Sequence, residues 1–278
     1  IVSGEIRLNL GDKAYEISKV PTEKMQQIRG NVVSLIFQEP KTSLNPVFRI
    51  GDQVDEVISL HDGEGKSKED IKKQTIHALE MVGIANSEGV YSMYPHELSG
   101  GMRQRVMIAM ALACNPRLII ADEPTTALDV TIQAQILKLM KDIKEQSKTS
   151  IIIISHDLGV IAEMADKVLV MYAGQVVEEA DVFELFDNPK HPYTKGLMDS
   201  IPHLEYDNTQ RLYSIPGSVP NPQNMPQGCR FHTRCPYVTN QCLNSNPSLF
   251  AVNQDHLVRC WLYNESEMTT STTEEVQN

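Results

Sequence analysis

The chain has no long apolar run. The densest one, Ile151–Ile154, is far shorter than the roughly 18 residues that a membrane span requires. Basic residues are scarce too: 25 Lys and Arg stand against 36 Asp and Glu, a formal net charge of −11, and no basic stripe suited to a nucleic-acid backbone is present. The chain starts with neither an initiator Met nor the basic region of a signal peptide. We therefore expect no membrane span, no secretion signal and no nucleic-acid partner, and the missing Met is typical of a fragment or a processed chain.

The 278 residues are 41% hydrophobic and 22% charged, which is enough apolar material for a proper core. Two short apolar runs, Leu118–Ala121 and Ile151–Ile154, stop at polar residues, as strands buried on both faces of a parallel sheet do. Between them, apolar residues recur at the spacing of one helix face: Ile132, Ile136, Leu139, Met140 and Ile143. A strand, a helix and a strand joined by short links form a βαβ unit, so the sequence predicts an α/β core. Further elements are expected at Leu158–Met164 (a helix), Lys167–Tyr172 (a strand) and Gln175–Glu178 (a strand).

Three parts of the chain differ from this core. Residues 51–115 carry a charged, amphipathic helical pattern without a convincing strand, which favours a helical insert. Beyond about Asp187 prolines crowd together, which favours an irregular appendage over a continued sheet. The last residues hold four Glu, no basic residue and many Ser and Thr, as disordered tails do. The predicted limits are 1–50 and 116–186 for the core, 51–115 for the insert, 187–263 for the extension and 264–278 for the tail.

The segment Leu98-Ser99-Gly100-Gly101 directly precedes a helical pattern. A serine and two glycines at the start of a helix leave unpaired backbone N–H groups at the positive end of the helix dipole, and glycine lets a phosphate approach the backbone closely. The alternative is a serine N-cap on an ordinary helix. Because Met102-Arg103-Gln104-Arg105 and then a strand ending in two acids follow, we favour the anion site.

Polar side chains stand at the ends of the predicted strands. Asp122 and Glu123 end one of them, where open α/β sheets place their ligands. Adjacent strand residues point to opposite sides, so one carboxylate can hold Mg²⁺ while the other acts as a general base. Gln38 follows the apolar stretch Val32–Phe37, and His156 ends the other strand. Each of these alone is typical of a surface or structural residue, and their order and their place at strand ends predict a site.

Taken together, these segments resemble those of an ABC-transporter ATPase. The segments similar to its Q-loop, signature, Walker B, D-loop and H-loop are Gln38, Leu98–Gly101, Leu118–Glu123, Ala127–Asp129 and His156. Residues 102–111 and 121–130, with His191-Pro192-Tyr193-Thr194, resemble the D-type subunit of oligopeptide and dipeptide permeases. The resemblance covers about residues 3 to 200. It implies an α/β fold: a P-loop NTPase core with a helical insert and a small irregular C-terminal extension.

The resemblance also implies roles in binding and hydrolysing ATP. Asp122 would hold Mg²⁺, Glu123 would polarise the attacking water, and His156 would contact the γ-phosphate. Gln38 would link the nucleotide to the membrane subunits. Such roles fit phosphoryl transfer, which needs positioning and charge stabilisation more than covalent chemistry.

An assembly is implied as well. Ser99, Gly100 and Gly101 would bind ATP held by a second ABC ATPase subunit, of the F-type, and Asp129 would lie at the interface between the two. The pair would drive two transmembrane permease subunits, to which an extracytoplasmic binding protein would deliver peptides. The chain would then be a peripheral subunit on the cytoplasmic face of the cell membrane, coupling ATP hydrolysis to the uptake of di- and oligopeptides.

A glycine-rich phosphate loop is absent from these residues. No G-x-x-x-x-G-K-[S/T] occurs, and Gly4, Gly11 and Gly30 are isolated. In the family that loop lies N-terminal to the segment that Ile1–Leu8 resembles. An N-terminal truncation or an incomplete reading frame explains the absence most simply. We therefore expect this chain to bind ATP weakly in its own Walker site, yet to be able to complete the site of a partner.

Four of the five cysteines lie together in the proline-rich extension: Cys229, Cys235, Cys242 and Cys260. An intracellular chain does not keep structural disulfides, so the group suggests metal ligands. Its spacing lacks the C-x₂-C pairs of zinc ribbons, and residues 228–236 resemble the motif of peptide-permease ATPases whose extension can carry an iron–sulfur cluster. We favour a [4Fe–4S] cluster, with Zn²⁺ and unmetallated thiols as alternatives. His232 is expected to be exposed, and Cys114 to be a buried structural thiol.

Three other functions are compatible with part of the pattern. A soluble ABC ATPase of translation or DNA repair is disfavoured, because such proteins usually hold two cassettes or long coiled coils and this chain has one signature and a short insert. An importer of nickel or another solute shares much of the core, since the substrate is chosen by other subunits. The third is a truncated, non-enzymatic chain that only completes the ATP site of a partner.

Overall fold

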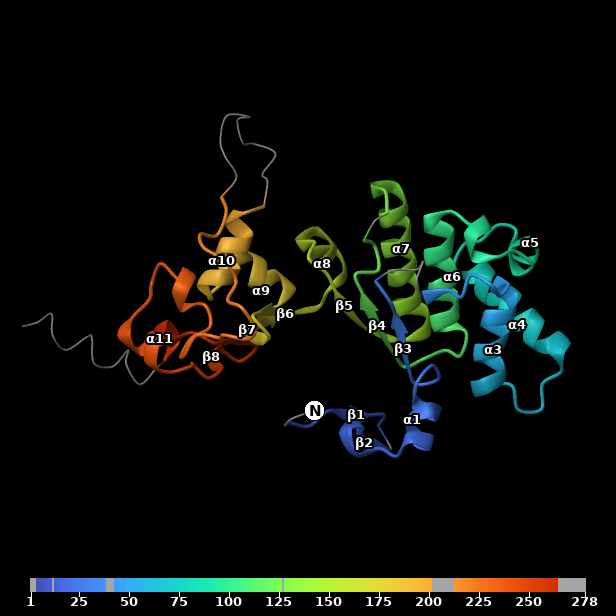
Figure 1. Ribbon diagram of the computed structural model, residues 1–278, viewed down its shortest axis with the longest axis horizontal. Coiled ribbons are helices and arrows are strands. Elements are labelled where there is room, and N and C mark those ends of the chain that lie inside the picture. The colour runs from blue at the N-terminus through green and yellow to red at the C-terminus, as the bar shows by residue number, and fades with distance from the viewer. Residues whose placement is uncertain (1–3, 12, 39–42, 127, 202–212, 265–278) are drawn as a thin grey trace, which may run out of the picture. The chain divides into compact units, whose positions relative to one another are not determined.

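The computed structural model describes residues 4–11, 13–38, 43–126, 128–201 and 213–264. The chain forms two compact units, 1–160 and 161–278 (Figure 1). Except for Asn264, the predicted tail lies outside the described residues, and the other predicted domain limits stay a prediction. None of the helices formed by the described residues combines the length and the apolar composition that crossing a lipid bilayer requires.

The first unit contains a parallel sheet of three strands. Its elements are β3 (Val33–Ile36), β4 (Leu118–Asp122), α7 (Val130–Ser147) and β5 (Ser150–Ile154). The strand order is β3-β4-β5, and α7 connects β4 to β5, so the predicted βαβ unit and α/β core are confirmed. Because the strands are parallel, their carboxyl ends meet at one edge: Ile36 pairs with Ala121, and Asp122 with Ile154.

The prediction that these strands are buried on both faces is wrong for one face of the sheet. Ile119 and Ala121 are buried, whereas Leu35 and Ile152, which lie side by side with Ile120 between them, are 42% and 50% exposed. Successive side chains of a strand alternate between its two faces. The described residues therefore cover one face of the sheet and leave the other open to solvent.

Residues 51–115, which the structure describes throughout, contain helices and no strand, as predicted. The helices of this insert are α3 (Ile50–His61), α4 (Lys68–Met81), α5 (Ser87–Tyr91) and α6 (Gly100–Leu112). Val54, Ile58 and Ile71 form its buried centre. Helix α6 also packs against β3, so the insert is joined to the sheet through the helix that follows the signature segment. Preceding the sheet are β1 (Arg7–Asn9), β2 (Ala14–Glu16) and α1 (Thr22–Ile28).

The second unit is built on an antiparallel sheet in the order β6-β7-β9-β8. Its strands are β6 (Lys167–Tyr172), β7 (Gln175–Asp181), β8 (Phe250–Asn253) and β9 (His256–Val258). Its helices are α9 (Val182–Asp187), α10 (Pro192–Asp199) and α11 (Asn240–Asn244), and α8 (Leu158–Met164) crosses the boundary between the units.

The extension does continue a sheet, contrary to the prediction from its prolines. Strand β9 pairs with β7 through Glu178 and Val258, and β8 pairs with β9. The two strands are only four and three residues long, which is too short to show a periodicity in the sequence. The extension is therefore a small domain folded onto strands that precede it in the chain.

Candidate functional site

The carboxylate of Glu123 lies at the carboxyl edge of the parallel sheet, where three predicted residues meet. His156 Nδ1 lies 3.0 Å from Glu123 Oε1, and Gln38 Nε2 donates to Oε2 at 2.7 Å. These residues follow β5 and β3, while Glu123 follows β4, so the parallel strand ends bring them together. Thr126 Oγ1 also donates to Oε2, at 2.8 Å. Sequence reasoning missed Thr126, although a hydroxyl three residues after a candidate base is a signal for such a contact.

The backbone around Glu123 is unusual. Its φ is +45°, in the left-handed region that residues other than glycine rarely adopt. The Glu123 N–H donates to Ile154 O at 2.9 Å, and the Thr126 N–H donates to Glu123 O at 3.1 Å. Such a conformation persists when its surroundings impose it, and it is frequent at active sites. This backbone conformation therefore directs the Glu123 side chain toward His156 and Gln38.

Hydrogen bonds hold the pKa of Glu123 below its usual range. The largest cause is the bond from His156, followed by that from Thr126, and Gln38 contributes further, while burial acts in the opposite direction. The charged form accepts all three bonds, so it is favoured over the protonated form. Asp122, the last residue of β4, is half-buried next to this group.

Ser99 is the N-cap of helix α6, which was the alternative interpretation of this residue. Its Oγ accepts from the Met102 N–H at 3.2 Å. The two glycines differ from each other. A Cβ on Gly100 would meet nothing within 4 Å, whereas a Cβ on Gly101 would lie 2.9 Å from Cγ2 of Ile132 on α7. Gly101 is thus required for packing, and Gly100 leaves open space in front of the helix N-terminus.

Asp129 also caps a helix. Its Oδ1 accepts from the Ile132 N–H at 2.9 Å at the start of α7, so the signature segment and Asp129 meet around Ile132. Within the described part of the chain, no hydrogen bond joins Ser99 or Asp129 to Glu123. The predicted residues therefore form two groups in unit 1, one around Glu123 and one at the start of α6 and α7.

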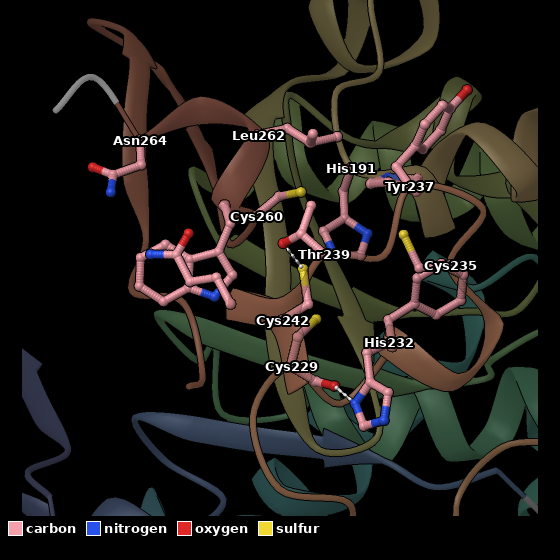
Figure 2. Close-up of a pocket in the computed structure, with 14 residues that line it drawn as sticks. His191, Cys229, His232, Cys235, Tyr237, Thr239, Cys242, Cys260, Leu262 and Asn264 are labelled. Atoms are coloured by element: carbon pink, nitrogen blue, oxygen red, sulfur yellow. Dashed lines mark hydrogen bonds between the residues drawn. The ribbon is translucent and has the colours of Figure 1, made fainter. Parts of the chain in front are cut away.

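The four clustered cysteines line one cavity of about 200 Å³ in the second unit, together with His191 and His232 (Figure 2). They come from separate parts of the unit. Cys229 lies in a loop, and Cys235 lies at the end of a short 3₁₀ turn. Cys242 lies in α11, and Cys260 lies two residues after the end of β9. Burial raises the pKa of the Cys229 and Cys235 thiols, and that of Cys260 to about 12. No group of three or more His, Cys, Asp or Glu side chains in the described ranges is close enough to hold one metal ion.

The expected exposure of His232 and the expected burial of Cys114 both need revision. His232 is half-buried, not exposed, because its Nδ1 lies 2.8 Å from the carbonyl oxygen of Cys229. Cys114 is only half-buried; its Sγ lies 3.7 Å from Val57 O, and burial raises its pKa to about 11.

A buried hydrogen-bonded cluster that sequence reasoning missed holds the extension together. Glu178 on β7 is fully buried and accepts from the backbone N–H groups of Lys190 and His191 at 2.6 and 2.9 Å. Its Oε1 also lies 2.7 Å from Nε2 of His256 on β9. His191 in turn caps α10, since its Nδ1 accepts from the Tyr193 N–H at 3.0 Å. The His-Pro-Tyr segment is therefore docked onto the sheet by Glu178.

Comparison with known proteins agrees with this architecture. The family model described as "ABC transporter" matches residues 2–126, and the one described as "Oligopeptide/dipeptide transporter, C-terminal region" matches residues 177–242. The oligopeptide transport ATP-binding protein AppD of Bacillus subtilis is 52% identical over 265 residues, 95% of this chain and 79% of AppD. The chain belongs to the peptide-permease family of ABC-transporter ATPases, and it resembles the D-type subunit. OppD of the same organism is also 52% identical, over 240 residues, 86% of this chain and 66% of OppD.

Solved structures place this permease ATPase in the same fold. The dimeric, post-hydrolysis structure of the ATP-binding cassette MJ0796 bound to ADP and Pi is 26% identical, with a TM-score of 0.58 over 65% of this chain and 74% of that one. A second dimeric structure of MJ0796 gives 27% and a TM-score of 0.56 over the same shares. The predicted fold, a P-loop NTPase of the ABC type, is confirmed. ATP hydrolysis with Mg²⁺ is the corresponding activity.

Proposed function

We propose that this chain is the ATP-hydrolysing subunit of an importer that takes up di- and oligopeptides. The observation that carries the proposal is the contact of Glu123 with both His156 and Gln38, which joins three strand ends around one carboxylate. The names of the relatives and the match to the peptide-transporter C-terminal region support peptides as the cargo.

Glu123 acts as the general base in this proposal. A carboxylate offers about four lone-pair positions. Gln38 and Thr126 use two of them at Oε2, and His156 uses one at Oε1. One position on Oε1 is left to accept a proton from the attacking water. Because the pKa of Glu123 is lowered, the carboxylate is ionised at neutral pH and ready to orient that water.

The other residues supply binding and charge stabilisation. Asp122 would hold Mg²⁺ at the end of β4, since a carboxylate oxygen is a ligand that this ion prefers. When bound, the ion neutralises charge on the phosphate oxygens. His156 would contact the γ-phosphate, and Gln38, placed at the end of β3, would relay the state of the nucleotide to the membrane subunits.

The signature group would act on a second subunit. Ser99, Gly100 and Gly101 would bind the γ-phosphate of ATP on the opposite ATPase, and Asp129 would lie at the interface. The open space in front of Gly100 supports such an approach. The partners are then a second ABC ATPase, of the F-type, and two transmembrane permease subunits, with a peptide-binding protein outside. The chain would be peripheral, on the cytoplasmic face of the membrane.

The missing phosphate loop limits what these 278 residues do alone. We expect the chain to bind Mg-ATP only weakly in its own Walker site and to complete the site of its partner through Ser99 and Gly101. Isothermal titration of the isolated chain measures this directly. Binding at micromolar concentration contradicts the expectation, and binding weaker than millimolar agrees with it.

The catalytic assignment is tested by Glu123→Gln with Glu145→Gln as its control. Both changes replace a carboxylate by an amide, and Glu145 is exposed on α7. ATP hydrolysis is measured with the partner subunits present, in a chain to which an N-terminal phosphate loop has been added, because these residues hold none. Glu123→Gln is expected to lower kcat by about a hundredfold or more, because general-base catalysis contributes about 10²–10⁴. An active Glu123→Gln protein refutes the role of Glu123.

A [4Fe–4S] cluster is the metal group that we propose for the extension. The donor set suits it, since four cysteines surround one cavity. Zn²⁺ is the alternative, because four thiolates suit that ion as well. The ligands of a cluster are spread over the corners of a cube. Cys229, Cys235, Cys242 and Cys260 would each bind one iron.

Iron and sulfide analysis of the anaerobically purified full chain tests the cluster. About four irons per chain are expected, with a broad visible absorbance that is lost on reduction. Cys242→Ser is expected to lose both, and Cys114→Ser, outside the cavity, to keep both. Stoichiometric zinc, or thiols without metal, would overturn the cluster.

A further inference from the structure

A buried glutamine joins the signature helix to the loop of the proposed base. Gln104 lies in the second turn of α6 and is 2% exposed. Its Nε2 donates to the carbonyl oxygen of Pro124 at 2.6 Å. Pro124 is the residue directly after Glu123. This hydrogen bond therefore connects the helical insert to the peptide unit that follows the reactive carboxylate.

The contact acts where the backbone is held in an unfavourable conformation. The φ of Glu123 is +45°, and such a conformation persists only when the surroundings impose it. On one side the Glu123 N–H is fixed to Ile154 O of β5. On the other side Gln104 fixes the carbonyl of Pro124. Loss of the glutamine amide would leave that buried carbonyl without its partner and free the turn to relax.

Helix α6 also packs against α3, α4 and β3, and two of its residues contact α7. Gly101 packs on Ile132, and Arg105 donates to Gln135 Oε1 at 2.8 Å, both on α7. Arg105 also donates to the carbonyl of Val82. Among the side-chain hydrogen bonds of Gln104 and Arg105, that of Gln104 ends on the loop that contains Glu123, and those of Arg105 do not.

We propose that Gln104 is a positioning residue for ATP hydrolysis, which couples the signature helix to the orientation of Glu123. The inference rests on the proposed function of Glu123 as the base. Gln104 touches neither nucleotide nor water in this scheme; it holds the turn in which the Glu123 carboxylate meets His156, Gln38 and Thr126. When the turn relaxes, these three hydrogen bonds lengthen, and the Glu123 carboxylate is no longer held in one orientation.

The test compares Gln104→Met with Arg105→Met in a chain that carries an N-terminal phosphate loop and is assembled with its partner subunits. Methionine has nearly the shape of glutamine and cannot donate. Gln104→Met is expected to lower kcat by about tenfold to a hundredfold, as a misplaced catalytic group does, while KM for ATP stays near that of the wild type. Arg105→Met, which breaks contacts to Val82 and Gln135, is expected to keep both the kcat and the KM of the wild type.

The outcomes separate this inference from the function on which it rests. If Glu123→Gln stays active, the proposed base is wrong. If Glu123→Gln is inactive but Gln104→Met has the wild-type kcat, the positioning role is wrong. Equal losses of kcat in Gln104→Met and Arg105→Met indicate general loosening and also overturn it. If Gln104→Met does not fold, Gln104→Asn, whose amide is one methylene shorter, is judged by the same comparison of kcat and KM.

Discussion

The two signature glycines are expected to respond in opposite ways to alanine. A Cβ on Gly101 would lie 2.9 Å from Cγ2 of Ile132 and 3.6 Å from its Cγ1. Cγ2 is attached directly to the branched Cβ of Ile132, so it cannot swing away without moving α7 or the rotamer. A Cβ on Gly100 would meet nothing within 4 Å. Gly101→Ala is therefore a packing change, and Gly100→Ala is not.

The magnitude follows from two opposing effects. Replacing glycine by alanine within a helix favours folding by about 0.5–1 kcal/mol, and both positions lie in the first turn of α6. Overpacking costs about 1–3 kcal/mol, and it applies to Gly101 alone. The helix contribution is shared, so the difference between the two variants isolates the clash. We expect Gly101→Ala to be less stable than Gly100→Ala by about 1–3 kcal/mol.

Urea unfolding of the two variants measures this difference. Ile132→Ala, combined with each variant, completes a double-mutant cycle. Removing the Ile132 methyl groups is expected to rescue Gly101→Ala and to leave Gly100→Ala unchanged, with a coupling of about 1 kcal/mol or more. ATP hydrolysis with the partner subunits should be lost in Gly100→Ala despite its stability, because the new methyl group occupies the open approach. Equal stabilities, or no coupling to Ile132, would refute the reasoning.

Three more outcomes are expected. Glu178→Gln should lower the free energy of unfolding by about 1–3 kcal/mol in urea, because its amide keeps one carbonyl oxygen and leaves the buried N–H of Lys190 or of His191 without an acceptor; an unchanged free energy of unfolding would contradict this. Burial lowers the pKa of His191 to about 3, so below pH 6.5 the unfolded chain binds a proton that the folded one does not. The free energy of unfolding should thus fall as the pH drops from 6.5, by up to about 1.4 kcal/mol per pH unit. His191→Asn keeps an oxygen that can cap the helix, and its free energy of unfolding should lose this dependence between pH 6.5 and 5. His156→Ala removes the largest cause of the lowered Glu123 pKa, so the acid limb of the pH–rate profile for ATP hydrolysis should move to higher pH. An unchanged acid limb would contradict the contact between His156 and Glu123.

The meeting of Gln38, Glu123 and His156 could be predicted because each follows a strand of one parallel sheet. Strands of a parallel sheet end at a common edge, so residues far apart in the chain become neighbours there. Thr126 and Gln104 could not be assigned in the same way. Their contacts depend on the turn at Glu123 and on the rotation of α6, which no local pattern encodes.

In the extension, too, contacts between residues far apart in the chain could not be predicted from the sequence. Its cysteines could be grouped by composition, and the structure places all four around one cavity. Its sheet could not be predicted, because β8 and β9 are too short for a periodicity, and β9 pairs with β7 through residues 80 positions apart in the chain, Glu178 and Val258. Glu178 is one of three acidic residues in β7, and only its burial against His256 and His191 distinguishes it from the other two.

The sequence by itself determined the α/β core, the helical insert and the family, since apolar periodicity and motif order are properties of neighbouring residues and survive in a linear reading. The tertiary structure decided which glycine is needed for packing, how the carboxylate of Glu123 is held, and which sheet face stays open. These depend on where side chains from distant segments meet, and close packing makes such contacts specific to a few tenths of an ångström.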